Sequence, residues 1–243
     1  HGSGEMSPAN IDRHIEWAKR GGFRYMTFPY QSFVREERSW CLCGNYDWNT
    51  NAYPNGAADL RAVLARVKAA GIVPGVHFLQ SPVGLRSRYV TPVADPRLSK
   101  KRRLTLASAV PAEGDIDELA VFEPLAGVPR TDGARLLQFG GELFSYESYE
   151  TGRPSRFRGV KRGAWNTRPA AHAAGEIGGV LDVSEYGDPA SCYPDLLTDL
   201  PDELSRKVAD LYACGFEYVY FDGAEGVSAP FNCGISDAIL RTW

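Results

Sequence analysis

Residues 215–226 read GFEYVYFDGAEG, an apolar run that ends in one carboxylate and is followed by glycines. An unbroken run of aromatic and β-branched residues is typical of a buried strand in a parallel sheet. A bare carboxylate is costly to bury, so Asp222 is expected to face water at the end of this strand. In α/β barrels and open α/β sheets, ligands bind at that carboxyl end. Asp222 is therefore the first candidate catalytic residue.

A repeated pattern of helix, glycine and strand surrounds this stretch. Each helical segment is amphipathic, and a glycine separates it from an apolar run. The three instances are 9–20 with 23–28, 59–70 with 72–78, and 202–213 with 216–222. Alternation of this kind predicts βαβ units and a parallel sheet.

The region between residues 80 and 176 breaks the pattern. Short alternating runs are separated there by turn residues such as Asp132-Gly133, which is typical of antiparallel β-structure. The runs lie at 104–107, 119–122, 136–139, 143–146 and 157–160. The segment GGVLDV at 178–183 then reads as another buried strand of the parallel sheet.

These patterns predict an α/β fold of the (β/α)8 TIM-barrel type with a small inserted antiparallel β-module. We expect residues 5–80 to form the first part of the barrel, residues 81–176 the β-rich module and residues 177–243 the continuation of the barrel. Only four parallel strands are predicted, whereas a complete barrel has eight strands and typically ~250 residues. The chain is therefore expected to hold part of a barrel, with a smaller open α/β sheet as the alternative.

Composition excludes several classes of function. The formal net charge of −3 predicts no general affinity for nucleic acid or for an anionic membrane surface. No apolar stretch approaches the ~20 residues that a membrane span needs. Five cysteines and four histidines form no set at metal-ligand spacing, so neither a metal nor a cofactor is expected. The basic run KKRR at 100–103 is interpreted as a solvated loop rather than a phosphate site.

A long aromatic loop, residues 29–56, follows the first predicted strand. Loops of this length are typically functional or disordered, and the aromatic content argues against disorder. The aromatic side chains that suit stacking on the apolar face of a sugar are Trp40, Tyr46, Trp48 and Tyr53, and Tyr30 is a further candidate substrate-binding residue. Asp47, Asn49 and Asn51 suit hydrogen bonding to the hydroxyl groups of the sugar. The alternative is that these aromatic side chains pack the loop onto the fold.

Four segments carry a resemblance to a known family. Residues 53–60 read YPNGAADL, residues 70–77 read AGIVPGVH, and VLDVS at 180–184 precedes YVYFD at 218–222. In this order and spacing they resemble segments of the α-galactosidase/α-glucosidase clan of retaining glycoside hydrolases. The resemblance implies a (β/α)8 barrel that hydrolyses α-linked bonds of oligo- or polysaccharides. It also implies that Asp222 is the nucleophile and forms a covalent glycosyl-enzyme.

The resemblance does not identify the second carboxyl group that such a mechanism needs. Retaining hydrolysis needs a proton donor roughly 5–5.5 Å from the nucleophile. Glu225 is the nearest candidate in sequence, although a loop carboxylate beside glycines also suits a helix N-terminus. The clan commonly has an acidic pair where this sequence has Phe28-Pro29-Tyr30, which argues against galactose-type recognition of an axial hydroxyl.

Three more polar residues at predicted strand ends are candidate substrate-binding groups. His77 lies near the tip of the second strand, and Asp182 and Glu185 follow the run that begins at Val180. Each has a structural alternative, since a satisfied core histidine and a buried hydrogen-bonding aspartate are both common.

Two other functions remain open from the sequence. The chain is alternatively a non-catalytic carbohydrate-binding or structural segment of a multidomain protein. Residues 215–222 also resemble a strand of chitinase-like barrels, which implies a hydrolase in which the acetamido group of the substrate assists. Tyr220 replaces one of the acidic residues of that strand, and Glu225 is displaced by one position. Further domains, or the remaining barrel strands, are expected as partners within the same protein. A secreted or periplasmic location would suit a glycan-degrading enzyme.

Overall fold

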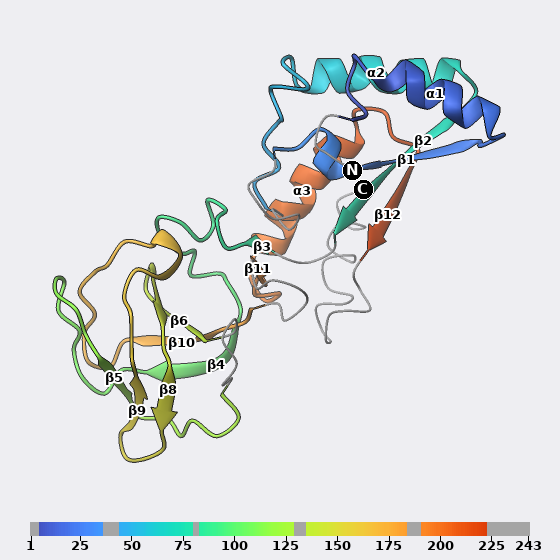
Figure 1. Cartoon of the computed structure of the whole chain (residues 1–243). Coiled ribbons are helices and arrows are strands. Elements are labelled where there is room, and N and C mark those ends of the chain that lie inside the picture. Colours follow the sequence, from blue (N-terminus) through green and yellow to red (C-terminus); the bar gives the residue numbers. More distant parts are fainter. Residues whose placement is uncertain (1–4, 36–43, 80–82, 129–134, 184–190, 223–243) are drawn as a thin grey trace. The chain divides into compact units, whose positions relative to one another are not determined.

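The chain is a mixed α/β protein that divides into two compact units (Figure 1). One unit comprises His1–Ser81 and Pro201–Trp243, and the other comprises Pro82–Leu200. The computed structural model describes residues 5–35, 44–79, 83–128, 135–183 and 191–222.

The first unit contains a three-stranded parallel sheet in the order β1-β2-β12. Its strands are β1 (Tyr25–Pro29), β2 (Val73–Leu79) and β12 (Tyr218–Asp222), and its helices are α1 (Ile11–Arg20), α2 (Ala57–Ala69) and α3 (Leu200–Tyr212). A short 3-10 helix, η1 (Tyr30–Ser32), follows β1. The predicted parallel pairing of these three strands is confirmed.

The two faces of this sheet differ. Met26, Phe28, Val76 and Phe78 alternate onto one face, where they join a buried apolar cluster with side chains of all three helices. The opposite face is left partly open by the described residues, because Tyr220 in β12 is 52% exposed. Parallel sheets are normally covered on both faces. The open face is therefore the surface of this unit on which a functional site is expected.

The YPNGAADL segment builds the start of α2. Tyr53 is fully buried, and its hydroxyl donates to the Met6 carbonyl at 2.6 Å. The Asp59 carboxylate accepts from the backbone N–H of Asn55 at 2.8 Å and from its side-chain amide at 3.1 Å. Gly56 precedes the helix with φ 55° and ψ −120°, a combination that only glycine adopts readily. This segment therefore positions the helix rather than a ligand.

Replacing Gly56 with alanine is expected to destabilise the first unit by about 2 kcal/mol, because the backbone is strained for any other residue. A Cβ atom there would also lie 3.1 Å from the Trp48 ring. Gly71→Ala is the matched control, since Gly71 also has a positive φ but no atom within 4 Å of such a Cβ. Urea unfolding followed by tryptophan fluorescence checks this, and equal costs for the two variants would contradict a role for Trp48.

The second unit is built of antiparallel β-structure. One sheet has the order β4-β10-β6-β7, another β5-β9-β8, and a third pairs β11 with β3. The strands are β3 (Val83–Gly84), β4 (Lys100–Thr105), β5 (Glu118–Val121), β6 (Leu136–Phe139), β7 (Glu142–Ser145), β8 (Ser148–Glu150), β9 (Ser155–Arg158), β10 (Ile177–Leu181) and β11 (Ser191–Cys192), with a 3-10 helix η3 (Ala164–Asn166). The two larger sheets share a separate apolar core. The prediction of an antiparallel module is confirmed.

Two sequence predictions in this region are wrong. The segment at 178–183 is not a barrel strand, because β10 pairs antiparallel with β4 and β6. It belongs to the second unit, so the boundary predicted at 176/177 does not match the division of the structure. The basic run at 100–103 is part of strand β4 and not a loop.

A buried carboxylate holds the segment after β9 in place. Glu142 is fully buried and accepts hydrogen bonds from Arg162 Nε at 2.9 Å and Nη2 at 2.7 Å. The backbone N–H groups of Gly163 and Ala170, at 3.2 and 2.9 Å, and His172 Nε2, at 3.1 Å, are its further partners. Desolvation opposes ionisation of Glu142, but these hydrogen bonds outweigh it and lower its pKa to about 2.

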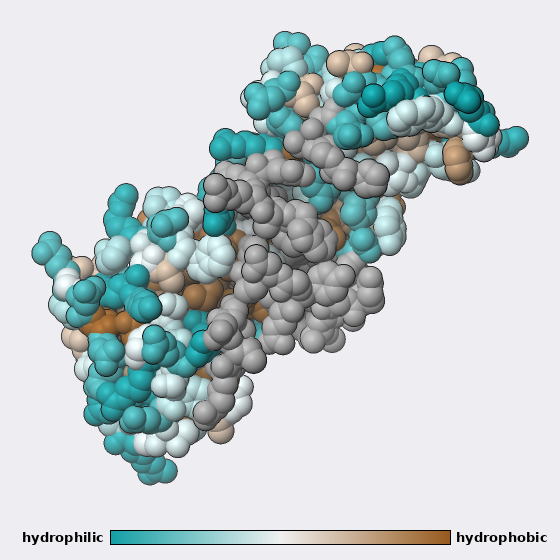
Figure 2. Space-filling view, in the orientation of Figure 1, coloured by the Kyte–Doolittle hydropathy of each residue, from teal (hydrophilic) through white to brown (hydrophobic). Residues whose placement is uncertain are grey.

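Polar residues cover most of the surface in view. Figure 2 shows hydrophilic residues across each unit, with hydrophobic residues in small groups between them. No helix in the described part of the chain is long and apolar enough to cross a membrane. Of the five cysteines, Cys192 and Cys214 lie in the described ranges, and both are buried and free.

Candidate functional site

The open face of the parallel sheet carries a cluster of three polar side chains. Asp222 Oδ2 lies 3.1 Å from His77 Nε2, and Asp222 Oδ1 accepts a hydrogen bond from the Tyr220 hydroxyl at 3.0 Å. The Tyr220 ring stacks on the His77 ring, with centroids 5.4 Å apart and planes 29° apart. The Asp222 side chain is 35% exposed and that of His77 is 21% exposed. Both oxygens of a half-exposed carboxylate are thus held by neighbouring side chains.

Strand register explains how the sequence builds this cluster. In the parallel pairing of β12 with β2, Tyr220 lies opposite His77 and Asp222 lies opposite Leu79. Tyr220 and Asp222 are two residues apart in one strand, so their side chains point to the same face. Tyr220 was not among the predicted site residues, although this alternation in the sequence was sufficient to place it beside Asp222.

A second tyrosine, Tyr218, links two strands on the same face of the sheet. The Tyr218 hydroxyl lies 2.6 Å from Thr27 Oγ1, so its side chain reaches across β2 to β1. Its ring occupies the space above Gly75, where a Cβ atom would lie only 2.1 Å from the ring. Glycine at position 75 therefore allows Tyr218 to connect the outer two strands below the Asp222 cluster.

The aromatic residues of this loop that lie within the described ranges pack against other side chains of the first unit. Tyr30 is only 2% exposed, and its ring stacks on Phe78 at 5.6 Å inside the core, so it offers no face to a ligand. Trp48 is half-buried, and its ring contacts Phe33 at 6.2 Å. Asp47 is exposed and stays a predicted sugar-binding residue.

Asp182 does not lie at the end of a barrel strand, where it was predicted to bind substrate. It follows β10 in the second unit, and its side chain is only 10% exposed. Ser99 Oγ donates to Asp182 Oδ2 at 3.2 Å, and Lys101 Nζ lies 3.9 Å from Oδ1. The alternative of a buried hydrogen-bonding aspartate fits this environment. Trp40, Glu185 and Glu225 lie outside the described residues.

The side chains around Asp222 hold its carboxylate in one orientation. Within the described ranges, no group of three or more histidine, cysteine, aspartate or glutamate side chains is arranged to hold a metal ion. A carboxylate has about four lone-pair sites, and the bonds from His77 and Tyr220 occupy one on each oxygen and fix its orientation.

No protein-family model matches the sequence, and no curated protein matches it.

Three solved structures show weak similarity to the chain. A proposed α-N-acetylgalactosaminidase from Bacillus halodurans has 11% identity and a TM-score of 0.43, over 99% of this chain and 42% of its own. Isomaltulose synthase from Klebsiella sp. LX3 has 9% identity and a TM-score of 0.46, over 92% and 32%. Trehalose-6-phosphate hydrolase from Bacillus licheniformis has 9% identity and a TM-score of 0.41, over 90% and 31%.

All three names are those of enzymes of sugar chemistry, and the chain spans less than half the length of each. Similarity at this level does not establish a family.

Proposed function

We propose that the first unit is part of a retaining glycoside hydrolase of the (β/α)8-barrel type, which cleaves α-linked bonds in oligo- or polysaccharides. Asp222 is the nucleophile. The observation that carries this proposal is the half-exposed Asp222 carboxylate, held by His77 and Tyr220 at the carboxyl end of a parallel strand.

The open sheet face supports the barrel assignment. In a (β/α) barrel the helices lie outside and the opposite face of the sheet lines the interior. Here α1, α2 and α3 share one apolar cluster on one face, and the other face carries Thr27, His77 and Asp222. Further strands of the same protein would cover this face and complete the barrel.

The proposed reaction has two steps. In the first, Asp222 attacks the anomeric carbon, the bond to the leaving oxygen breaks, and a carboxylic acid protonates that oxygen. In the second, the same group deprotonates a water molecule, which attacks the anomeric carbon and releases Asp222. Glu225 is the proposed acid/base, with a carboxylate from another part of the protein as the alternative.

A mechanism-based label tests the assignment directly. The protein is incubated with 5-fluoro-α-glucosyl fluoride, which forms a glycosyl-enzyme that breaks down slowly. Intact mass spectrometry should show the gain of one fluoroglycosyl group, and peptide mapping should place it on Asp222. A label on any other residue, or a product of inverted anomeric configuration, would contradict the proposal.

One observation favours a second function, carbohydrate binding without hydrolysis. The Tyr220 ring is 52% exposed and already fixed by stacking on His77, so it offers a rigid apolar platform for a sugar ring. Glycan binding by the full protein, without turnover of any aryl α-glycoside, would establish this function in place of the first.

A further inference from the structure

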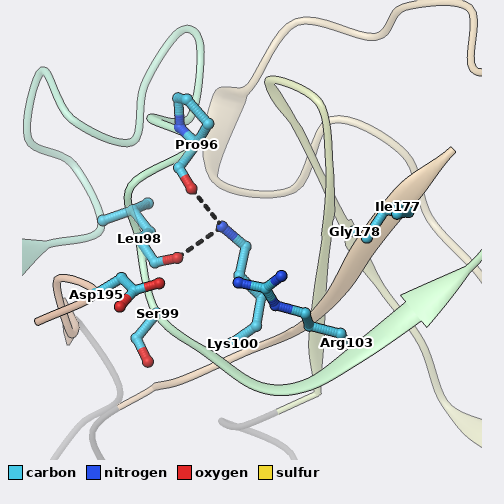
Figure 3. A pocket seen from close by; sticks show the side chains of 8 residues that line it. All are labelled: Pro96, Leu98, Ser99, Lys100, Arg103, Ile177, Gly178 and Asp195. Atoms are coloured by element: carbon cyan, nitrogen blue, oxygen red, sulfur yellow. Dashed lines mark hydrogen bonds between the residues drawn. The ribbon is translucent and has the colours of Figure 1, made fainter. Parts of the chain in front are cut away.

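The second unit contains a polar pocket beside the outer strand of its four-stranded sheet (Figure 3). Its volume is about 330 Å³, and it is lined by Pro96, Leu98, Ser99, Lys100, Arg103, Ile177, Gly178 and Asp195. All of these residues belong to the second unit, so the pocket is formed within that unit alone.

A β-bulge brings the two cations of this pocket together. Residues three apart in a regular strand point to opposite faces. Here Arg103 lies opposite Gly179 and Lys100 lies opposite Leu181, with a register shift between Val180 and Leu181. Because Gly179 and Leu181 share a face of β10, Lys100 and Arg103 share a face of β4. Bulges commonly re-aim a side chain in this way next to functional sites.

The Lys100 side chain is folded into the unit rather than extended into water. Its ammonium group donates to the carbonyls of Leu98 at 2.6 Å and Pro96 at 2.9 Å, as the dashed lines in Figure 3 show. Its stem packs over Gly179, where a Cβ atom would lie 3.1 Å from Lys100 Cγ. An ammonium has three donors. One N–H of Lys100 is therefore left without an acceptor among the described residues.

The two cations of the pocket, Lys100 and Arg103, make no direct ion pair with the carboxylates of the described residues. Desolvation, and the nearby Arg103, lower the pKa of Lys100 to about 8 against the opposing effects of Asp195, Cys192 and Asp95. Lys100 thus still carries its charge at pH 7. No carboxylate of the described residues lies within ion-pair distance of either Lys100 or Arg103.

The other two basic residues of β4, Lys101 and Arg102, have polar partners outside the pocket. Lys101 lies 3.9 Å from the Asp182 carboxylate, and Arg102 donates to the carbonyls of Pro124 and Ala126 at 2.9 and 2.6 Å. Charged side chains on an outer strand often serve only to prevent pairing with other chains. Prevention of pairing with other chains is a sufficient role for Lys101 and Arg102. It does not explain why a bulge directs the side chains of Lys100 and Arg103 into the same pocket.

We infer that this pocket binds the oxyanion group of a small hydroxylated ligand, a sugar carboxylate or a sugar phosphate. The oxyanion lies between Lys100 and Arg103, where it accepts charge-assisted hydrogen bonds. Asp195 and Ser99 line the same pocket and supply partners for hydroxyl groups. The inference does not depend on Asp222, so it stands or falls separately from the proposed hydrolase activity.

Isothermal titration calorimetry at pH 7 and low salt tests the pocket with glucuronate, glucose 6-phosphate and glucose. At least one of the two acids should bind with a dissociation constant on the order of 1 mM. Glucose should bind at least about tenfold more weakly because it lacks the oxyanion. The tighter of the two acids identifies the group that the pocket prefers.

Two variants separate the pocket from general charge effects. Arg103→Gln should weaken binding about tenfold, because it removes one charged partner of the oxyanion. Arg61→Gln, on exposed α2 surface in the first unit, should leave affinity unchanged. Equal affinity for glucose and the acids, no binding of either acid, or full affinity of Arg103→Gln would overturn the inference. Inorganic phosphate binding as tightly as glucose 6-phosphate would overturn the role of the sugar hydroxyls.

Discussion

Replacing Asp222 with alanine is expected to lower kcat on aryl α-glycosides by on the order of 10⁴-fold. The reason is that the variant lacks the atom that bonds to the anomeric carbon, while the surrounding sheet face stays in place. Azide, a small nucleophile, fits the space left by the carboxylate and should restore turnover with formation of a β-glycosyl azide. Steady-state kinetics with and without azide, and identification of the product by NMR, measure both effects.

Asp210→Ala is the matched control for this variant. Asp210 is an exposed carboxylate on α3 in the same unit, so its removal changes the net charge equally but should leave kcat unchanged. Undiminished turnover by Asp222→Ala would remove this residue from the mechanism. Loss of turnover without azide rescue would assign it to orientation of His77 instead of attack on the sugar.

Replacing Glu142 with glutamine is expected to destabilise the second unit by about 3–5 kcal/mol, the usual cost of leaving a buried charge unpaired. The Arg162 side chain is only 6% exposed and would lose its counter-charge. A glutamine amide group also presents N–H donors to Arg162 and His172, where Glu142 presents only acceptors. Urea unfolding of the wild-type and variant chains, followed by circular dichroism, measures the difference.

Glu118→Gln is the control within the same unit. Glu118 also pairs with two arginines, Arg156 and Arg158, but its side chain is 41% exposed. Surface ion pairs contribute about 0–1 kcal/mol, so this variant should be nearly as stable as the wild type. Similar losses of unfolding free energy for Glu142→Gln and Glu118→Gln would show that burial does not determine how much an ion pair stabilises the unit.

Glu142 is also expected to change how the stability of the second unit depends on pH. Its pKa falls from an ordinary 4.5 to about 2 on folding, so its contribution is present above pH 4.5 and is lost as the pH falls towards 2. The pKa of His172 is raised above 6.5, because the hydrogen bonds that it donates to the Glu142 and Glu176 carboxylates outweigh its desolvation. Its contribution is full below pH 6.5 and is lost as the pH rises through the raised pKa. In the Glu142→Gln variant, the part of this loss of stability that comes from Glu142 between pH 4.5 and pH 2 should be absent.

The sequence was sufficient to predict the parallel strands and the carboxylate at their end. The runs at 23–28, 72–78 and 216–222 are β1, β2 and β12, with ends that shift by no more than two residues. These strands are apolar where they meet the helices, and glycines mark the turns that precede them. Local patterns of this kind depend on neighbouring residues alone, so they can be recognised without the fold.

Strand neighbours could not be predicted in the same way. His77 and Asp222 are 145 residues apart, and only the order β1-β2-β12 brings them together. The misassigned β10 shows the same limit, because an apolar run reports burial and not the direction of the adjacent strands. The basic run of β4 does not look like a strand in the sequence, because the partners of Lys101 and Arg102, such as Asp182 for Lys101, come from distant parts of the chain.

The pairing of β3 with β11 has a consequence for the history of this architecture. Val83 lies opposite Cys192, and Gly84 lies opposite Ser191, so a strand at the start of the second unit pairs with one eight residues before its last residue, Leu200. Their backbones are about 5 Å apart, as in any antiparallel pair. A unit that closes on itself near its two ends can be inserted or removed as one cassette. Recombination between related genes could therefore exchange such cassettes as single pieces.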